Sequence, residues 1–118
     1  MTIRRMKTYT GEQGYVYQYY FVGRRATSEE GAGGVEYIFD VTADRKTMYS
    51  VSVVLPEKLL TDWAAAHGRQ LTDAEQYGAV KMRLFQGFDE IEDMMANGRR
   101  LVIDSVILEA ALEKLGVA

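Results

Sequence analysis

The spacing of the hydrophobic residues changes near Pro56, and this change constrains the fold more than any other feature of the sequence. Before Pro56, apolar and aromatic residues recur at every second position, and after it they recur at every third or fourth. Side chains alternate between two faces along a β-strand, whereas residues three or four apart share one face of an α-helix. Strands followed by helices predict an α+β fold, with helices packed on one face of an antiparallel sheet.

Three segments carry the alternating pattern of strands: residues 15–22, 35–42 and 47–55. Their aromatic and β-branched side chains are typical of strands, and short connections between them predict an antiparallel meander. Two further segments leave the size of the sheet open. Residues 99–104 can form a short fourth strand, and residues 2–9 either add an edge strand or form a mobile arm. We therefore predict three to four strands.

The second half of the chain predicts two to four helices. Pro56 opens the first helix, which Gly68 ends, and Thr72-x-x-Glu75 has the spacing of a capping box at the start of the next helix. Residues 73–97 then keep one apolar stripe, which predicts one long helix with a kink at Gln86-Gly87 or two helices nearly in line. Residues 105–116 predict the last helix.

Composition excludes several classes of protein. Apolar residues make up 47% and charged residues 26% of the 118, which is ordinary for one globular domain over residues 1–118. The chain has no cysteine, so disulfides, thiolate catalysis and cysteine-ligated metals are excluded. No apolar run is long enough to span a membrane. The N-terminus lacks the apolar stretch of a secretory signal, so we expect a cytoplasmic protein.

No catalytic group is evident from the residue pattern. His67 is the only histidine, and its position in the last turn of a helix suits a cation near the helix dipole. Asp89 and Asp93 are four residues apart and can share a cation, but they also fit the polar side of an amphipathic helix. The glycine run at residues 31–34 lacks the lysine of a phosphate-binding loop. We predict a non-catalytic protein with no cofactor and no metal.

The two faces of the predicted sheet differ in polarity. One face is apolar in all three strands and includes the aromatic row Tyr15, Tyr17, Tyr19 and Phe21, which we assign to the core. The other face mixes apolar and polar residues, which suits an interface with a second copy or another protein. Its candidate interface residues are Val16, Tyr20, Val22, Ile38, Met48 and Val54. Association, as a homodimer or an accessory domain, is the first functional hypothesis.

Two alternatives remain open. In the first, the protein is a small-ligand-binding protein or an enzyme, and the hydroxyls of four tyrosines orient a largely apolar ligand in a pocket between sheet and helices: Tyr17, Tyr19, Tyr37 and Tyr49. In the second, a basic N-terminal arm contacts a polyanion such as nucleic acid through Arg4, Arg5, Arg24 and Arg25. Glu36 and Asp40 lie on the outward face of the same predicted sheet and would repel phosphate, which disfavours nucleic acid.

Overall fold

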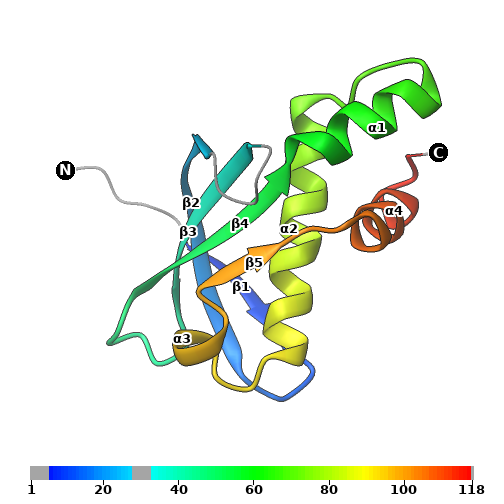
Figure 1. Cartoon of the computed structure of the whole chain (residues 1–118). Coiled ribbons are helices and arrows are strands. Elements are labelled where there is room, and N and C mark those ends of the chain that lie inside the picture. Colours follow the sequence, from blue (N-terminus) through cyan, green and yellow to red (C-terminus); the bar gives the residue numbers. More distant parts are fainter. Residues whose placement is uncertain (1–5, 28–32, 118) are drawn as a thin grey trace.

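The sheet has five strands, adjacent in chain order. The computed structural model describes residues 6–27 and 33–117. Within these residues the sheet consists of β1 (Lys7–Thr10), β2 (Val16–Thr27), β3 (Gly34–Thr42), β4 (Tyr49–Pro56) and β5 (Arg100–Val102). The first four strands pair antiparallel, and β5 pairs parallel with β4 (Figure 1). The predicted α+β class and the largely antiparallel sheet are confirmed, but the predicted count of three to four strands is wrong.

Both segments that the sequence left open contain strands, which explains the difference. Lys7–Thr10 pairs with the start of β2, and Arg100–Val102 pairs with the middle of β4. The chain passes through three helices between β4 and β5, and such a crossover returns the chain parallel to the strand it left. A three-residue strand carries too few alternations for its pairing to be read from sequence.

Strand β2 is longer than predicted and contains a β-bulge. It continues to Thr27, where it pairs with the start of β3. Phe21 pairs with Phe39, but Gly23 pairs with Ile38, so Val22 is the extra residue of the bulge. The bulge shifts the alternation of β2 by one residue. Arg24 therefore lies opposite Tyr37 on the helix side, and Arg25 lies opposite Glu36 on the other side.

The described residues form four helices, of which the first three lie between β4 and β5 and the last follows β5: α1 (Glu57–His67), α2 (Asp73–Glu90), α3 (Met94–Asn97) and α4 (Ser105–Lys114). The predicted capping box is confirmed, because Thr72 Oγ1 accepts a bond from the Glu75 amide at 3.1 Å and Glu75 Oε1 accepts one from the Thr72 amide at 2.9 Å. Gly68 ends α1 in the left-handed conformation with φ of 71°. In the described residues, no helix is both long and apolar enough to cross a membrane.

The interpretation of residues 73–97 is wrong in the position of its break. Helix α2 ends at Glu90, and Asp93 caps a separate short helix, so the chain turns at Ile91–Asp93 and not at Gln86-Gly87. Gly87 lies within α2 and packs closely on β5, since a Cβ there would lie 2.9 Å from Leu101 Cδ1. This glycine is therefore a contact point between helix and sheet.

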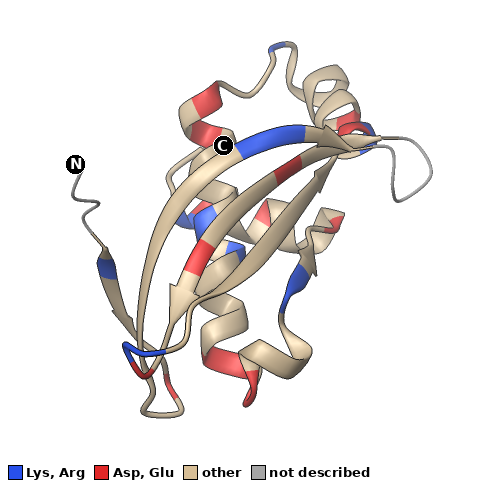
Figure 2. Ribbon diagram, turned by 90° about the vertical axis from the view of Figure 1, so that its left-hand side faces the viewer, with Lys and Arg blue, Asp and Glu red and all other residues tan. Residues whose placement is uncertain are grey.

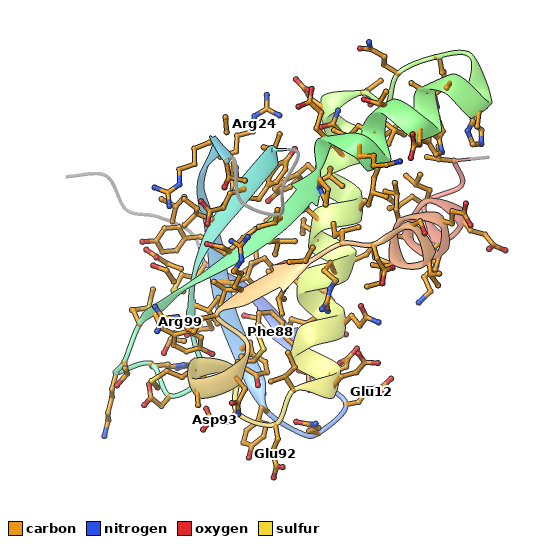
Figure 3. The ribbon with its side chains drawn as sticks, viewed as in Figure 1. Glu12, Arg24, Phe88, Glu92, Asp93 and Arg99 are labelled. Carbon is orange, nitrogen blue, oxygen red and sulfur yellow. The ribbon has the colours of Figure 1, made fainter. Side chains whose placement is uncertain are left out.

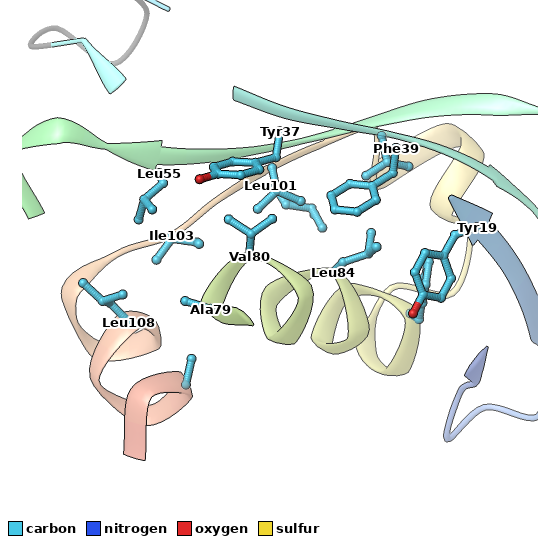
Figure 4. Packing of buried hydrophobic residues seen from close by; sticks show 14 of the residues in the cluster. Tyr19, Tyr37, Phe39, Leu55, Ala79, Val80, Leu84, Leu101, Ile103 and Leu108 are labelled. Carbon is cyan, nitrogen blue, oxygen red and sulfur yellow. The ribbon is translucent and has the colours of Figure 1, made fainter. Parts of the chain in front are cut away.

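The core lies between one face of the sheet, here called the inner face, and helix α2, with α4 packed against α2 (Figures 1 and 4). Phe39, Val51 and Val53 are fully buried on the strands, and Val80, Leu84 and Phe88 meet them from α2. Tyr17 stacks on Phe88 with ring centroids 4.2 Å apart.

Two members of the predicted aromatic core row are not buried. Tyr15 is 47% exposed because it precedes β2, and Phe21 is 39% exposed. Strand β1 pairs only as far as Tyr19, so in the described residues no neighbouring strand flanks Phe21 on that side. Tyr17 and Tyr19 are buried, as the alternation predicted.

Candidate functional site

The face of the sheet that points away from the helices, here called the outer face, carries a small apolar patch. We define the outer-face patch as Tyr20, Val22 and Ile38. The bulge places Val22 next to the Gly23–Ile38 pair, and Tyr20 lies two residues earlier on the same strand. Val22 is 46% exposed, and Tyr20 and Ile38 are half-buried. The patch therefore lies on β2 and β3, beyond the last residue at which β1 pairs with β2, on a face that Figure 2 shows with the helices behind it.

Charged side chains of both signs surround the outer-face patch. Tyr20 donates from its hydroxyl to Asp40 Oδ2 at 2.7 Å. Arg25 Nε donates to Glu36 Oε1 at 2.5 Å, and Arg100 Nη1 lies 4.0 Å from Glu36 Oε2. The hydrogen bond from Arg25 lowers the pKa of Glu36, further helped by Ser52 and by the charge of Arg100. Among the described residues, these two arginines and two carboxylates balance in charge.

The other predicted interface residues lie outside the patch. Val16 begins β2 and Met48 precedes β4, and each is 46% exposed. Val54 has no exposed surface, which removes it from the candidate interface. Its neighbours on the flanking strands are Glu36 and Val102, and Glu36 pairs with Arg100 of β5. The parallel strand β5 flanks β4 at Val54, so this position is internal to the sheet.

The predicted polyanion contacts are already paired with acidic or hydroxyl groups where the structure describes them. Arg24 Nη2 lies 3.6 Å from Asp73 Oδ2, and its Nη1 donates to the Tyr37 hydroxyl at 3.4 Å (Figure 3). Arg25 is bound to Glu36. Arg4 and Arg5 lie outside the described residues. The two arginines that are described have carboxylate partners within the same chain, so this geometry does not favour a phosphate-binding surface.

The four predicted pocket tyrosines divide into two pairs. Tyr19 and Tyr37 belong to the packed core, and the Tyr37 hydroxyl lies 3.5 Å from Gln76 Oε1. Tyr17 and Tyr49 instead line an open pocket of about 530 Å³ at the end of the sheet beside α3, not between sheet and helices. This end pocket is lined by Tyr15, Tyr17, Ala43, Asp44, Thr47, Tyr49, Glu92, Asp93, Met94, Met95 and Asn97.

Two separate chain segments bring carboxylates to the end pocket. Asp44 comes from the β3–β4 turn, where its Oδ1 accepts bonds of 2.8 Å from the Lys46 and Thr47 amides. Glu92 and Asp93 come from the break between α2 and α3, and Figure 3 shows both at that end of the molecule. Asp93 Oδ1 caps α3 through the Ala96 amide at 3.1 Å.

The break after α2 also separates the two carboxylates that the sequence placed on one helix face. Asp89 accepts a 2.8 Å bond from the Tyr9 hydroxyl and a 3.0 Å bond from the Glu12 amide, on the side of β1. Asp93 lines the end pocket instead. The i, i+4 relation of these residues therefore predicted the wrong neighbours. Sequence reasoning missed Asp44 and Glu92 as neighbours because only the folded turns bring them together.

Burial and nearby charge raise the pKa values of two tyrosines that line the end pocket. Burial, helped by the nearby Tyr17 and Asp93, raises the pKa of Tyr49 to about 12, while the charge of Arg99 opposes the rise. Burial, Tyr15 and Asp93 likewise raise the pKa of Tyr17. The Arg99 guanidinium lies 5.7 Å from the centre of the Tyr49 ring (Figure 3). Both phenols remain neutral hydrogen-bonding groups over the ordinary pH range.

His67 has a structural position, as its place in the sequence indicated. It is the last residue of α1, its Nδ1 lies 3.0 Å from the Trp63 carbonyl oxygen, and its ring stacks on Trp63 with centroids 4.1 Å apart.

Among the described residues, no three or more histidine, aspartate or glutamate side chains gather to hold a metal ion. The two features available for function are thus the outer-face patch and the end pocket. Comparison with family models, curated proteins and solved structures finds no match to this chain.

Proposed function

We propose that this protein acts by association, and that its partner is a second copy of the same chain docked on the outer face of the sheet. The observation that carries this proposal is the outer-face patch. Tyr20, Val22 and Ile38 form an apolar centre on a sheet face that no helix of the described chain covers. An apolar centre within a polar rim is the usual arrangement of a protein interface.

The charge of the rim favours a second copy over a strongly charged partner. In a two-fold symmetric interface the same surface meets itself, so a rim of one sign would repel its copy. Here Arg25 and Arg100 balance Glu36 and Asp40. A rotated copy can place the basic side of one rim against the acidic side of the other.

Twisted sheets also suit this mode of docking. Two sheets pack face to face about 10 Å apart, with their strands aligned within about 30° or crossed near a right angle. At that distance a valine, an isoleucine and a tyrosine from each copy can interdigitate. Tyr20 contributes both apolar area and a hydroxyl already bound to Asp40, so its burial leaves no unpaired polar group.

The proposal is tested by sedimentation velocity over a concentration series, with the wild type and with Val22→Lys and Ile38→Lys. We expect the wild type to dimerise with a Kd of about 10 µM or tighter. Each substitution occurs twice in a symmetric interface and buries an unpaired charge at its centre, so each should weaken the dimer about 100-fold or more.

Val106→Lys is the matched control, because Val106 is 73% exposed on α4, in the helix layer. This variant should dimerise like the wild type. A wild type that stays monomeric at about 1 mM would contradict the proposal. Dimers that persist in both Val22→Lys and Ile38→Lys would show that another surface associates.

A further inference from the structure

The end pocket contains two buried tyrosines whose hydroxyls have no partner. Tyr17 is 2% exposed and Tyr49 is 8% exposed. Neither hydroxyl makes a hydrogen bond to any residue that the structure describes, although the described residues leave no fully buried side-chain polar atom without a partner. The two hydroxyl oxygens must therefore reach solvent, and both tyrosines line the end pocket. They are hydrogen-bonding groups fixed in place by buried rings.

The rings are held so rigidly that the hydroxyl positions are set before any ligand binds. Tyr17 is stacked on the fully buried Phe88, with the two rings 8° from parallel. Tyr49 pairs with Val41 in the sheet and carries the Arg99 guanidinium over its ring. Preorganised polar groups bind a ligand without the entropic cost of ordering them.

The charge of the end pocket selects the sign of its ligand. Asp44, Glu92 and Asp93 line the pocket, and Arg99 is the cation beside it. Two backbone amides and the Thr42 hydroxyl already bond Asp44 Oδ1, but Glu92 makes no hydrogen bond or ion pair within the described chain. Asp93 uses one oxygen as the helix cap, which leaves Oδ2 for a ligand. An anion would be repelled here.

The same lining argues against a bare metal ion and for an organic cation. Among the described residues, the carboxylates of the end pocket do not form a group that could hold a metal ion. The exposed ring of Tyr15 and the exposed Met95 instead provide apolar surface beside the carboxylates. Aromatic faces and carboxylates together bind ammonium and guanidinium groups. A hydrocarbon chain attached to such a group can lie against Tyr15 and Met95.

We propose that the end pocket binds a small organic cation, an aliphatic amine or guanidine. Glu92 and Asp93 accept hydrogen bonds from its charged group, the hydroxyls of Tyr17 and Tyr49 accept further ones, and its hydrocarbon part contacts Tyr15 and Met95. This site lies at the end of the sheet and does not depend on the outer-face patch. The failure of either proposal would therefore leave the other unaffected.

The proposal is tested by isothermal titration calorimetry of the full chain with agmatine, which carries both an amine and a guanidinium. We expect a Kd of about 1 mM or tighter, as is usual for a ligand of this size. Glutarate, a dianion of similar length, and neutral 1,5-pentanediol should not bind measurably. A lysine side chain of another protein presents the same chemistry, so Nα-acetyl-lysine methylamide is titrated in parallel. Tighter binding of this compound than of agmatine would identify a protein side chain as the source of the cation.

Three conservative variants locate the site. Glu92→Gln and Asp93→Asn each remove one charge, and asparagine retains the cap of α3, so each should weaken agmatine binding about 5-fold. Tyr49→Phe removes only the hydroxyl and should weaken binding about 3-fold. Glu113→Gln, an exposed carboxylate on α4, is the control and should bind like the wild type.

Two results would overturn this proposal. One is the absence of agmatine heat at about 20 mM with a wild type whose circular dichroism shows it folded. The other is binding that persists unchanged in Glu92→Gln, Asp93→Asn and Tyr49→Phe. Because Glu92 is exposed and makes no hydrogen bond or ion pair within the described chain, Glu92→Gln keeps the test valid even if another variant folds poorly.

Discussion

The inner and outer faces of the sheet are built from alternate residues of the same strands, yet helices of the described chain cover only the inner face. Phe39 is fully buried against α2, whereas the adjacent Ile38 is half-buried on the outer face. The inner face is apolar across three strands, and the outer face mixes an apolar patch with a neutral ionic rim. Strand alternation therefore determines which residues share a face, but not what covers that face.

The prediction with the largest expected effect compares alanine substitutions of Phe39 and Ile38, one on each face of the sheet. Phe39→Ala should lower the free energy of unfolding by about 3–5 kcal/mol, because it opens a cavity among rigid neighbours. Ile38→Ala removes less buried area and leaves no cavity, so it should cost about 1 kcal/mol. Urea denaturation of both variants, at a protein concentration too low for association, measures the two values.

Equal losses for the two variants would contradict the assignment of faces. In that case the outer face would also belong to a core within one copy of the chain. Repeating the measurement at high protein concentration then adds information about the proposed dimer. If Ile38 packs against a second copy, its substitution should cost more at high concentration, and Phe39→Ala should keep its value.

Much of the fold was predictable from the sequence, because the spacing of nearby residues determines which side chains share a face of a strand and where a helix begins. The alternation of residues 35–42 and 47–55 placed the inner face correctly, and the Thr72–Glu75 spacing located the start of α2. The bulge at Val22 and the turn at Ile91–Asp93 carry no such signal. Neither the two-residue period of a strand nor the 3.6-residue period of a helix marks where such an irregularity falls.

The candidate sites were less predictable, because each joins residues from several segments. The sequence identified Tyr20, Val22 and Ile38 as outward residues through alternation alone. It also proposed Tyr17 and Tyr49 for a pocket, but grouped them with Tyr19 and Tyr37, which the structure places in the core. The end pocket draws on the β3–β4 turn and the α2–α3 break. No periodicity relates two turns that lie about fifty residues apart in the chain.

Glu36, like its neighbour Val54, is an exception to the comparison, since it lies on the outer face but is only 8% exposed. Glu36→Gln should lower the free energy of unfolding by about 1 kcal/mol near neutral pH, because Arg25 and Arg100 lose their charged partner. The native pKa of Glu36 lies below its ordinary value of 4.5, so the ionised carboxylate stabilises the fold above that pH. The stabilisation is lost as the pH falls through the native pKa, so the variant and the wild type should converge in acid.

Denaturation of both proteins between neutral and acidic pH tests this prediction, with Glu113→Gln as the exposed control. The control should match the wild type throughout. If the difference between Glu36→Gln and the wild type stayed constant down to strongly acidic pH, the ion pairs of the outer face would not be its cause. The effect would then reflect altered packing beside Val54.

The smallest expected effect marks the border of the inner face, where Tyr49 meets the end pocket. Tyr49→Phe should change the free energy of unfolding by less than about 0.5 kcal/mol at neutral pH, because the hydroxyl has no partner in the described chain. By comparison, Tyr9→Phe should lower it by about 1 kcal/mol, because this variant loses the hydrogen bond to Asp89. The pKa of Tyr49 is raised from 10.0 to about 12, so the native state retains a proton that the unfolded state releases in this interval. Wild-type stability should therefore fall between these pH values, and Tyr49→Phe should lose less. Alkaline denaturation curves that remain parallel would mean that the Tyr49 hydroxyl is freely solvated, which would also remove it from the end pocket as a preorganised group.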